Sequence, residues 1–185
     1  MLDVPAVCGV YSRLFYDINR QPRSWDCIRP DIGGIPIPGN HDVPDAERAI
    51  RDRIVRQPFD AALIAALSER DVLNGIHSFS AVYDGDLRRT EIGVLRRDNC
   101  PTGTALLDAL RIPDQFVIGD NAPYDLRKVP PGMIDRIQDR IRIPAVILEV
   151  RNDLLGDATA IEMVARELVE AIRRVVPLRR LRGAA

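Results

Sequence analysis

Four polar clusters in the sequence each follow an apolar run and carry side chains that can do chemistry. They are Asp17-Ile18-Asn19-Arg20, His77-Ser78-Phe79, Gly119-Asp120-Asn121-Ala122-Pro123-Tyr124 and Glu149-Val150-Arg151-Asn152-Asp153. An α/β sheet collects its binding site at the carboxyl ends of its strands, and such clusters are typical of those ends. The spacing therefore predicts a site assembled from several strand ends.

His77 and Glu149 are the candidates for catalysis. The imidazole of His77 can act from a strand end as a metal ligand or a base, or it can be an ordinary structural histidine. Glu149 is the only acidic residue in residues 144–150, PAVILEV. A carboxylate in such apolar surroundings must be paired, bound to a metal or raised in pKa. The structural alternative is an ion pair between Glu149 and Arg151 or another arginine.

Asn19 and Arg20 are the candidates for binding a carboxylate. The guanidinium of Arg20 is a planar fork that can hold both oxygens of a carboxylate, and Asn19 can add a further hydrogen bond. The structural alternative is an ordinary arginine at the entrance of a loop. Each candidate residue thus has a structural explanation when it is taken alone. The functional interpretation therefore rests on the order of the clusters along the chain.

Hydrophobic patterning predicts alternating strands and helices. Strands are expected over residues 6–18, 72–79, 91–95, 116–118 and 144–150, and helices over 45–70 (kinked or divided at Pro58), 104–110 and 159–176, the last with Asp157 as its N-cap. Residues 21–40 contain four prolines and predict a long surface loop. The expected fold class is α/β, with a mixed, mostly parallel sheet flanked by helices.

Length and composition predict a soluble globular protein. The 185 residues are 46% hydrophobic and 29% charged, so we expect one domain over residues 1–176 and a basic flexible tail over 177–185. The 26 basic and 27 acidic residues are interspersed, which argues against a nucleic-acid partner. Three cysteines without CxxC spacing and the lack of a long apolar run predict a cytoplasmic protein without a membrane segment.

Five stretches resemble, in wording and order, the N-formylglutamate amidohydrolase family. They are YSRLFYDINR, IHSFSAVYDG, EIGVLRRD, VIGDNAPYD and LEVRNDLL, and the resemblance covers nearly all of residues 11–172. The order of Asn19-Arg20, His77-Ser78-Phe79 and Glu149-Val150-Arg151 is also similar to that of the zinc carboxypeptidases. The resemblance implies a hydrolase-like fold of the zinc exopeptidase type, possibly incomplete here.

The resemblance also implies a role for each candidate residue. It makes His77 a zinc ligand and Glu149 the general base and acid, with a substrate-binding set of Asn19, Arg20, Asp120, Tyr124 and Arg151. Zinc would lower the pKa of a bound water, and Glu149 would take its proton as hydroxide attacks the carbonyl. The implied reaction converts an N-acyl amino acid, such as N-formyl-L-glutamate, into formate and the free amino acid.

The chain departs from the family in its zinc ligands. A catalytic zinc keeps three protein ligands, and the resemblance supplies His77 alone, so the others are expected in an N-terminal segment that this chain lacks. Family histidines are also replaced, by Asp60 in one case and within residues 135–139 in another. A non-catalytic carboxylate-binding module, or a structural domain that docks another protein, are the alternatives to a zinc amidohydrolase. The expected partner is a small N-acyl amino acid, with homo-oligomers possible.

Overall fold

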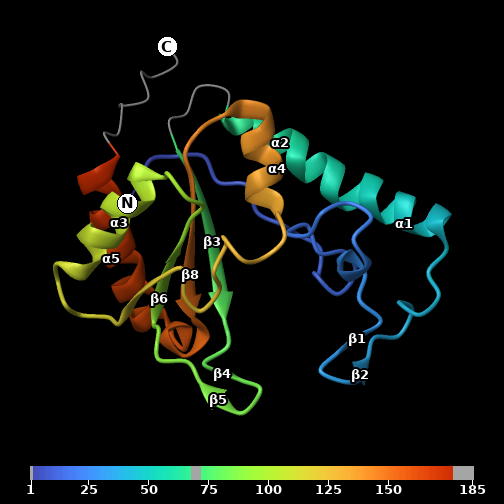
Figure 1. Cartoon of the computed structure of the whole chain (residues 1–185), viewed down its shortest axis with the longest axis horizontal. Coiled ribbons are helices and arrows are strands. Elements are labelled where there is room, and N and C mark those ends of the chain that lie inside the picture. Colours follow the sequence, from blue (N-terminus) through green and yellow to red (C-terminus); the bar gives the residue numbers. More distant parts are fainter. Residues whose placement is uncertain (1, 68–71, 177–185) are drawn as a thin grey trace. The chain divides into compact units, whose positions relative to one another are not determined.

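The computed structural model describes residues 2–67 and 72–176, which divide into two compact units (Figure 1). The first unit contains residues 2–4, 72–130 and 143–176, and the second contains residues 5–67 and 131–142. The single domain expected over residues 1–176 stays a prediction, and the expected tail over 177–185 lies outside the described residues. None of the described helices has the length and apolar character needed to cross a membrane.

A four-stranded sheet forms the centre of the first unit. Its strands are β3 (Leu73–Phe79), β6 (Ile92–Leu95), β7 (Ile118–Asp120) and β8 (Ala145–Arg151), in the order β3-β8-β6-β7. The pairs β3–β8 and β6–β7 are parallel, whereas β6 and β8 are antiparallel. The mixed, mostly parallel sheet of the expected α/β class is therefore confirmed. A hairpin of β4 (Val82–Tyr83) and β5 (Asp86–Leu87) connects β3 to β6.

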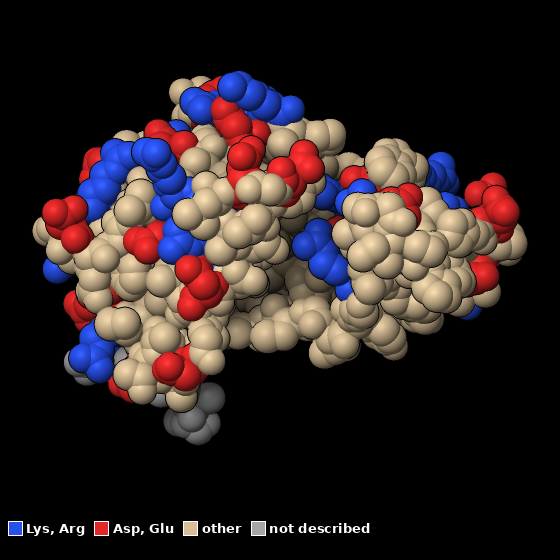
Figure 2. Space-filling view, turned by 90° about the horizontal axis from the view of Figure 1, so that it is seen from below, with Lys and Arg blue, Asp and Glu red and all other residues tan. Residues whose placement is uncertain are grey.

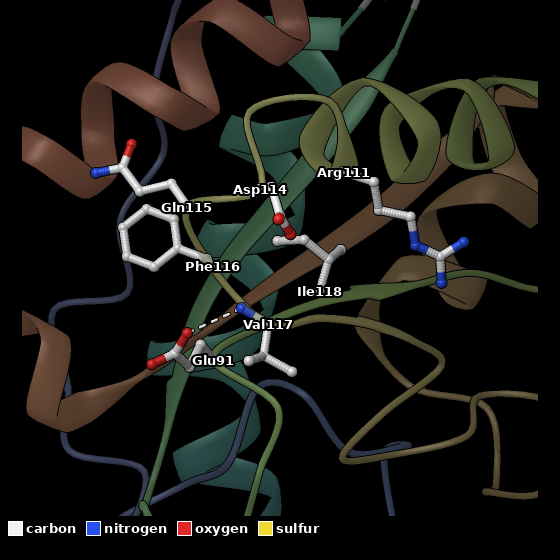
Figure 3. Close-up of a pocket in the computed structure, with 7 residues that line it drawn as sticks. All are labelled: Glu91, Arg111, Asp114, Gln115, Phe116, Val117 and Ile118. Atoms are coloured by element: carbon white, nitrogen blue, oxygen red, sulfur yellow. Dashed lines mark hydrogen bonds between the residues drawn. The ribbon is translucent and has the colours of Figure 1, made fainter.

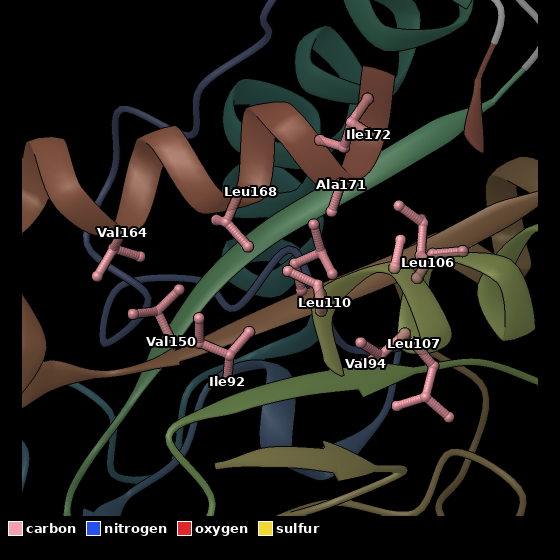
Figure 4. Packing of buried hydrophobic residues seen from close by; sticks show 13 residues of the cluster. Ile92, Val94, Leu106, Leu107, Leu110, Val150, Val164, Leu168, Ala171 and Ile172 are labelled. Atoms are coloured by element: carbon pink, nitrogen blue, oxygen red, sulfur yellow. The ribbon is translucent and has the colours of Figure 1, made fainter. Parts of the chain in front are cut away.

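Two helices, α3 (Pro101–Arg111) and α5 (Ala158–Val175), pack on one face of this sheet (Figures 1 and 4). Side chains alternate between the two faces of a strand. Along β8, Val146, Leu148 and Val150 are 0%, 0% and 3% exposed and belong to the core formed with these helices. The alternate residues of β8, including Glu149, must therefore project from the opposite face.

The local signals for α5 and the core strands are confirmed. The carboxylate of Asp157 accepts a hydrogen bond from the amide of Ala160 at 2.9 Å, which is the expected N-cap. The four strands and the two helices of the first unit lie within a few residues of their predicted positions. A short 3-10 helix, η3 (Asn152–Leu155), leads from β8 toward α5.

The strand expected over residues 6–18 is wrong. This segment forms only turns and irregular structure, and Val10 is 86% exposed. Asp17 is 5% exposed, and its carboxylate accepts hydrogen bonds from the backbone amide of Asn19 at 3.0 Å and from Arg13 at 2.7 Å. Such a hydrogen bond between an aspartate side chain and the nearby backbone competes with the hydrogen bonds of strand pairing.

The second unit is built on a long helical stretch and on α4 (Met133–Ile141), which the sequence analysis did not anticipate. The stretch consists of α1 (Asp45–Arg51), the π-helical segment η2 (Asp52–Arg56) and α2 (Gln57–Leu67). Pro58 lacks an amide donor and crowds the carbonyl four residues before it, so a change of hydrogen bonding just ahead of it is expected. The predicted interruption at Pro58 therefore takes the form of a π-helical segment.

Buried polar side chains hold the irregular part of the second unit, residues 5–44. The regular elements of this part are the 3-10 helix η1 (Trp25–Cys27) and the hairpin of β1 (Asp31–Ile32) and β2 (Ile35–Pro36). Asn40 is 5% exposed and donates to the carbonyls of Leu14 at 2.7 Å and Arg29 at 2.8 Å. Arg51 donates to the Asn40 side chain at 2.7 Å. These bonds satisfy backbone groups that have no strand or helix partner.

Asp52 is the carboxylate at the middle of the helical stretch. Burial opposes its ionisation, but hydrogen bonds from Arg56, Tyr16 and Gln57 outweigh burial and lower the pKa of Asp52 from 3.8 to about 2. The same burial, together with the hydrogen bond to Asp52, raises the pKa of Tyr16. A carboxylate with a depressed pKa stabilises the fold above its unfolded-state pKa and loses this effect as the pH falls through the folded-state value.

We therefore expect Asp52→Asn to lower the free energy of unfolding by about 2 kcal/mol at pH 6, with the difference from wild type shrinking between pH 4 and pH 2. Urea unfolding at pH 6, 4 and 2 measures this difference. The control is Asp139→Asn, which removes an exposed carboxylate of α4. A difference that stays constant from pH 6 to pH 2 would contradict the assignment.

Candidate functional site

A row of four residues crosses the sheet of the first unit in register. His77 of β3 pairs with Glu149 of β8, Glu149 pairs with Gly93 of β6, and Gly93 pairs with Gly119 of β7. Residues paired in this way project from the same face of a sheet. The row lies on the face opposite α3 and α5, and we call this face of the first unit the site face.

Glu149 occupies the centre of the row. Its side chain projects from the most apolar strand of the unit, and the residue is 6% exposed. On one side its neighbour is an imidazole, and on the other its neighbour is a glycine. Because glycine has no side chain, His77 is the one register partner of Glu149 that places a side chain directly beside its carboxylate. The register thus brings His77 and Glu149 side by side, and their shared role in a site stays a prediction.

Gly93 and Gly119 make room for the loop that follows β7. A Cβ on Gly93 would lie 2.2 Å from the carbonyl oxygen of Ala122, and a Cβ on Gly119 would lie 2.7 Å from the Thr90 side chain and 3.0 Å from that of Ala122. The loop therefore returns across the site face and brings the Ala122 carbonyl to the row. The sequence analysis missed both glycines, although a glycine inside an apolar strand is a known signal of close backbone approach.

We expect Gly93→Ala to lower the free energy of unfolding by about 2 kcal/mol, because the added methyl group would collide with a backbone oxygen rather than with a flexible side chain. The matched control is Gly156→Ala, where the nearest atom to the added Cβ is 3.7 Å away. Chemical unfolding of both variants measures the effect. Equal stability of the two variants would show that the loop does not lie against Gly93.

Asp120 does not join the row. It pairs with Val94, whose side chain belongs to the helix-covered core, and it forms an ion pair with Arg96 at 3.2 Å. Because β6 runs antiparallel to β8, the carboxyl end of β7 lies at the opposite edge of the sheet from Arg151. The expectation that all strand-end clusters gather at one edge is therefore wrong for Asp120.

Tyr124 returns toward the other edge through the loop. Its hydroxyl accepts a hydrogen bond from Nη1 of Arg88 at 3.0 Å. Arg88 also lies 5.7 Å from the ring of Phe79, which ends β3 on the same face as His77. Tyr124 is thus linked to the part of the first unit that carries the row, while its role as a substrate contact stays a prediction.

Arg151 is fully engaged by the protein. Its five N–H groups match five acceptors: both carboxylate oxygens of Asp153, the carbonyls of Arg88 and Arg89, and the carboxylate of Glu91. The hydrogen bond to Asp153 is the main cause that raises the pKa of Arg151. Arg151 therefore joins the end of β8 to the segment before β6, and binding a substrate would require breaking one of these bonds.

Asn19 and Arg20 lie in the second unit. The side-chain oxygen of Asn19 accepts from the amide of Met133 at the start of α4, at 3.4 Å, and Nε of Arg20 lies 2.9 Å from Asp26. Arg136 of α4 donates to the carbonyls on either side of Asn19, those of Ile18 at 3.1 Å and Arg20 at 3.2 Å. The backbone of this predicted carboxylate anchor is thus held by α4.

Arg136 is itself fixed by Asp60 of α2. Two bonds of 2.9 Å join its guanidinium to the two oxygens of Asp60, and the two residues are 8% and 3% exposed. Asp60 and residues 135–139 are the places where the sequence departs from the family's histidines. At these places the structure has a buried, two-pronged ion pair, a geometry that is strong for arginine and carboxylate.

We expect Arg136→Met to lower the free energy of unfolding by about 3 kcal/mol, because it removes the donor of one oxygen of the buried Asp60 carboxylate and the donor of two backbone carbonyls, while Arg56 still donates to the other Asp60 oxygen. Arg140→Met, on an exposed position of the same helix, should change it by less than about 0.5 kcal/mol. Urea unfolding at pH 7 distinguishes the two. Similar losses in both variants would mean that helix propensity, not the ion pair, is responsible.

The described residues do not by themselves fit a catalytic zinc site. Such a site keeps three protein ligands. Within residues 2–67 and 72–176, no group of three or more His, Cys, Asp or Glu side chains could hold a metal ion. His77 supplies one imidazole, and its neighbour in the row supplies one carboxylate.

A separate hollow of about 340 Å³ lies beside the segment between α3 and β7 (Figure 3). Its lining includes Glu91, Arg111 and Asp114. The carboxylate of Glu91 already accepts from the amide of Val117 at 2.8 Å and from Arg151 at 3.2 Å. Because this carboxylate is used in the fold, the row on the site face is the better candidate.

Figure 2 shows acidic and basic side chains interspersed on the face in view.

An α/β sheet with an imidazole and a buried carboxylate in register defines a candidate acid–base site. The structure is similar to the crystal structure of the gene product Atu2144 from Agrobacterium tumefaciens, with a TM-score of 0.77 and 28% identity, over 90% of this chain and 68% of that one. No curated protein matches the chain. The model of the N-formylglutamate amidohydrolase family matches residues 1–156. The chain belongs to this family of hydrolases that act on an amide bond.

Proposed function

We propose that the protein hydrolyses the amide bond of an N-acyl amino acid such as N-formyl-L-glutamate, with Glu149 as the general base and acid. The observation that carries the proposal is the register of β3 and β8, which pairs His77 with a carboxylate that is 6% exposed. Membership of the N-formylglutamate amidohydrolase family supports the choice of bond. The products would be formate and the free amino acid.

Glu149 can move one proton in two steps. Its carboxylate would take a proton from the attacking water as the new C–O bond forms at the acyl carbon. The resulting carboxylic acid would then give this proton to the amide nitrogen as the C–N bond breaks. The low exposure of Glu149 keeps bulk water from competing for the proton.

Zinc dependence is a further part of the proposal. A bound zinc ion would supply a Lewis acid for the acyl oxygen and the water. His77 is the donor that we assign to such an ion, with the remaining ligands outside the described residues. Asn19 and Arg20 as a carboxylate anchor, and Asp120, Tyr124 and Arg151 as further substrate contacts, stay predictions from the family resemblance.

We expect Glu149→Gln to lower kcat on N-formyl-L-glutamate by about 100-fold to 10,000-fold, because an amide of the same shape cannot accept the proton. Glu162→Gln, on an exposed position of α5, is the control and should keep wild-type kcat. Formate release measures the rate. Wild-type kcat in Glu149→Gln would exclude Glu149 as the base.

Elemental analysis of the same preparations tests the zinc assignment. In a longer form of the protein that supplies the remaining ligands, we expect zinc in the wild type and in Glu149→Gln, and its loss in His77→Ala. A wild type that hydrolyses the substrate without bound zinc would contradict zinc dependence and leave the role of Glu149 standing. Tight binding of N-formyl-L-glutamate without any turnover would instead favour the alternative of a non-catalytic carboxylate-binding module.

A further inference from the structure

Arg88 is held in a defined position at the end of the β4–β5 hairpin. Its backbone amide donates to the carbonyl of Ala81 at 2.8 Å, which closes the hairpin. Its own carbonyl accepts from Nη1 of Arg151 at 3.0 Å. Since Arg151 is fully engaged, it fixes the backbone of Arg88 from the β8 side.

The side chain of Arg88 lies among three aromatic rings. The central carbon of its guanidinium is 4.5 Å from the ring centre of Tyr83, 5.0 Å from that of Tyr124 and 5.7 Å from that of Phe79. Such contacts hold the face of a guanidinium while its edge remains able to donate. The three rings come from β4, from the loop after β7 and from β3, so they fix the orientation of the plane from several sides.

Most donors of Arg88 have no acceptor in the described part of the chain. Nη1 donates to the Tyr124 hydroxyl at 3.0 Å, while no hydrogen bond to a described residue uses Nε or Nη2, and no described carboxylate forms an ion pair with Arg88. The residue is half-buried. A partly desolvated guanidinium with a free edge is suited to a carboxylate, which can take two parallel N–H bonds.

Arg88 is connected to the row on the site face through two of its aromatic neighbours. Phe79 follows His77 by two residues on β3, and therefore projects from the same face. Tyr124 follows Ala122 by two residues, and the Ala122 carbonyl lies over Gly93, the neighbour of Glu149. Arg151, one of the two arginines that the resemblance assigns to the substrate, has no unused N–H group.

We infer that Arg88 binds a carboxylate of the N-acyl amino acid through the Nε and Nη2 edge of its guanidinium. This assignment rests on the proposed function, because it takes the substrate to be an acyl amino acid bound on the site face. It makes Arg88 a specificity-determining residue for substrates with a carboxylate near the scissile amide. Phe79, Tyr83 and Tyr124 orient the guanidinium and do not themselves need to contact the substrate.

The test compares three substrates: N-formyl-L-glutamate, N-formyl-L-glutamine, and the α-amide of N-formyl-L-glutamate. Each of the last two lacks one carboxylate. We expect Arg88→Met to lower kcat/KM on N-formyl-L-glutamate by about tenfold to 100-fold, mainly through KM. One of the two amides lacks the carboxylate that Arg88 binds. On that amide, the kcat/KM values of Arg88→Met and the wild type should agree within about threefold. Equal losses on all three substrates, or no loss, would overturn the assignment.

Two further variants separate binding from folding. Arg89→Met, at the exposed neighbouring position, should behave as wild type. Arg88→Lys keeps the positive charge without the planar fork, and should fall between wild type and Arg88→Met on N-formyl-L-glutamate. If Arg89→Met lowers kcat/KM on N-formyl-L-glutamate as much as Arg88→Met does, the effect belongs to the hairpin and not to the Arg88 guanidinium.

Binding in the Glu149→Gln background distinguishes this inference from the proposed function. Calorimetry with N-formyl-L-glutamate should give a dissociation constant that rises by about tenfold to 100-fold when Arg88→Met is added. Binding without turnover in the wild type would defeat the proposed hydrolysis, and the dissociation constants would still decide the role of Arg88. No measurable affinity with Arg88 intact, or the same affinity after its replacement, would overturn the role itself.

Discussion

The alternation of side chains along β8 is the constraint on which the candidate site depends. Val146, Leu148 and Val150 are buried against α3 and α5, and this burial sets the register of the strand, since a shift by one residue would turn the whole apolar set away from the helices. Glu149 must then project from the other face. The burial of the opposite side of β8 against α3 and α5 therefore sets the face from which this carboxylate projects.

Backbone proximity shapes the site face as much as side chains do. Gly93 and Gly119 continue the row of His77 and Glu149 across β6 and β7 without adding any side-chain volume. The loop after β7 uses this space, and it places the Ala122 carbonyl against Gly93 of β6 and Tyr124 beside Arg88, which precedes β6. One face of a small sheet thus combines an imidazole, a buried carboxylate, a backbone oxygen and an aromatic group.

Three arginines illustrate how partners decide what one residue type can do. Arg136 forms a buried pair with Asp60 and holds the backbone around Asn19. Arg151 uses all five of its N–H groups within the first unit, where it joins the end of β8 to the segment before β6. Arg88 is stacked on aromatic rings and keeps donors available, which is the arrangement that favours binding of a carboxylate from solution.

The sequence by itself determined the positions of the core strands and of α5, because hydrophobic periodicity and an aspartate N-cap are local signals. It also singled out His77 and Glu149, since a polar residue inside an apolar strand is visible without any tertiary contact. Tertiary structure decided the direction of β6, which separates Asp120 from the row, and it replaced the expected strand over residues 6–18 with turns. It also decided which arginines keep free donors. These outcomes depend on pairing between segments far apart in the chain, and the energy of such pairing cannot be read from either segment alone.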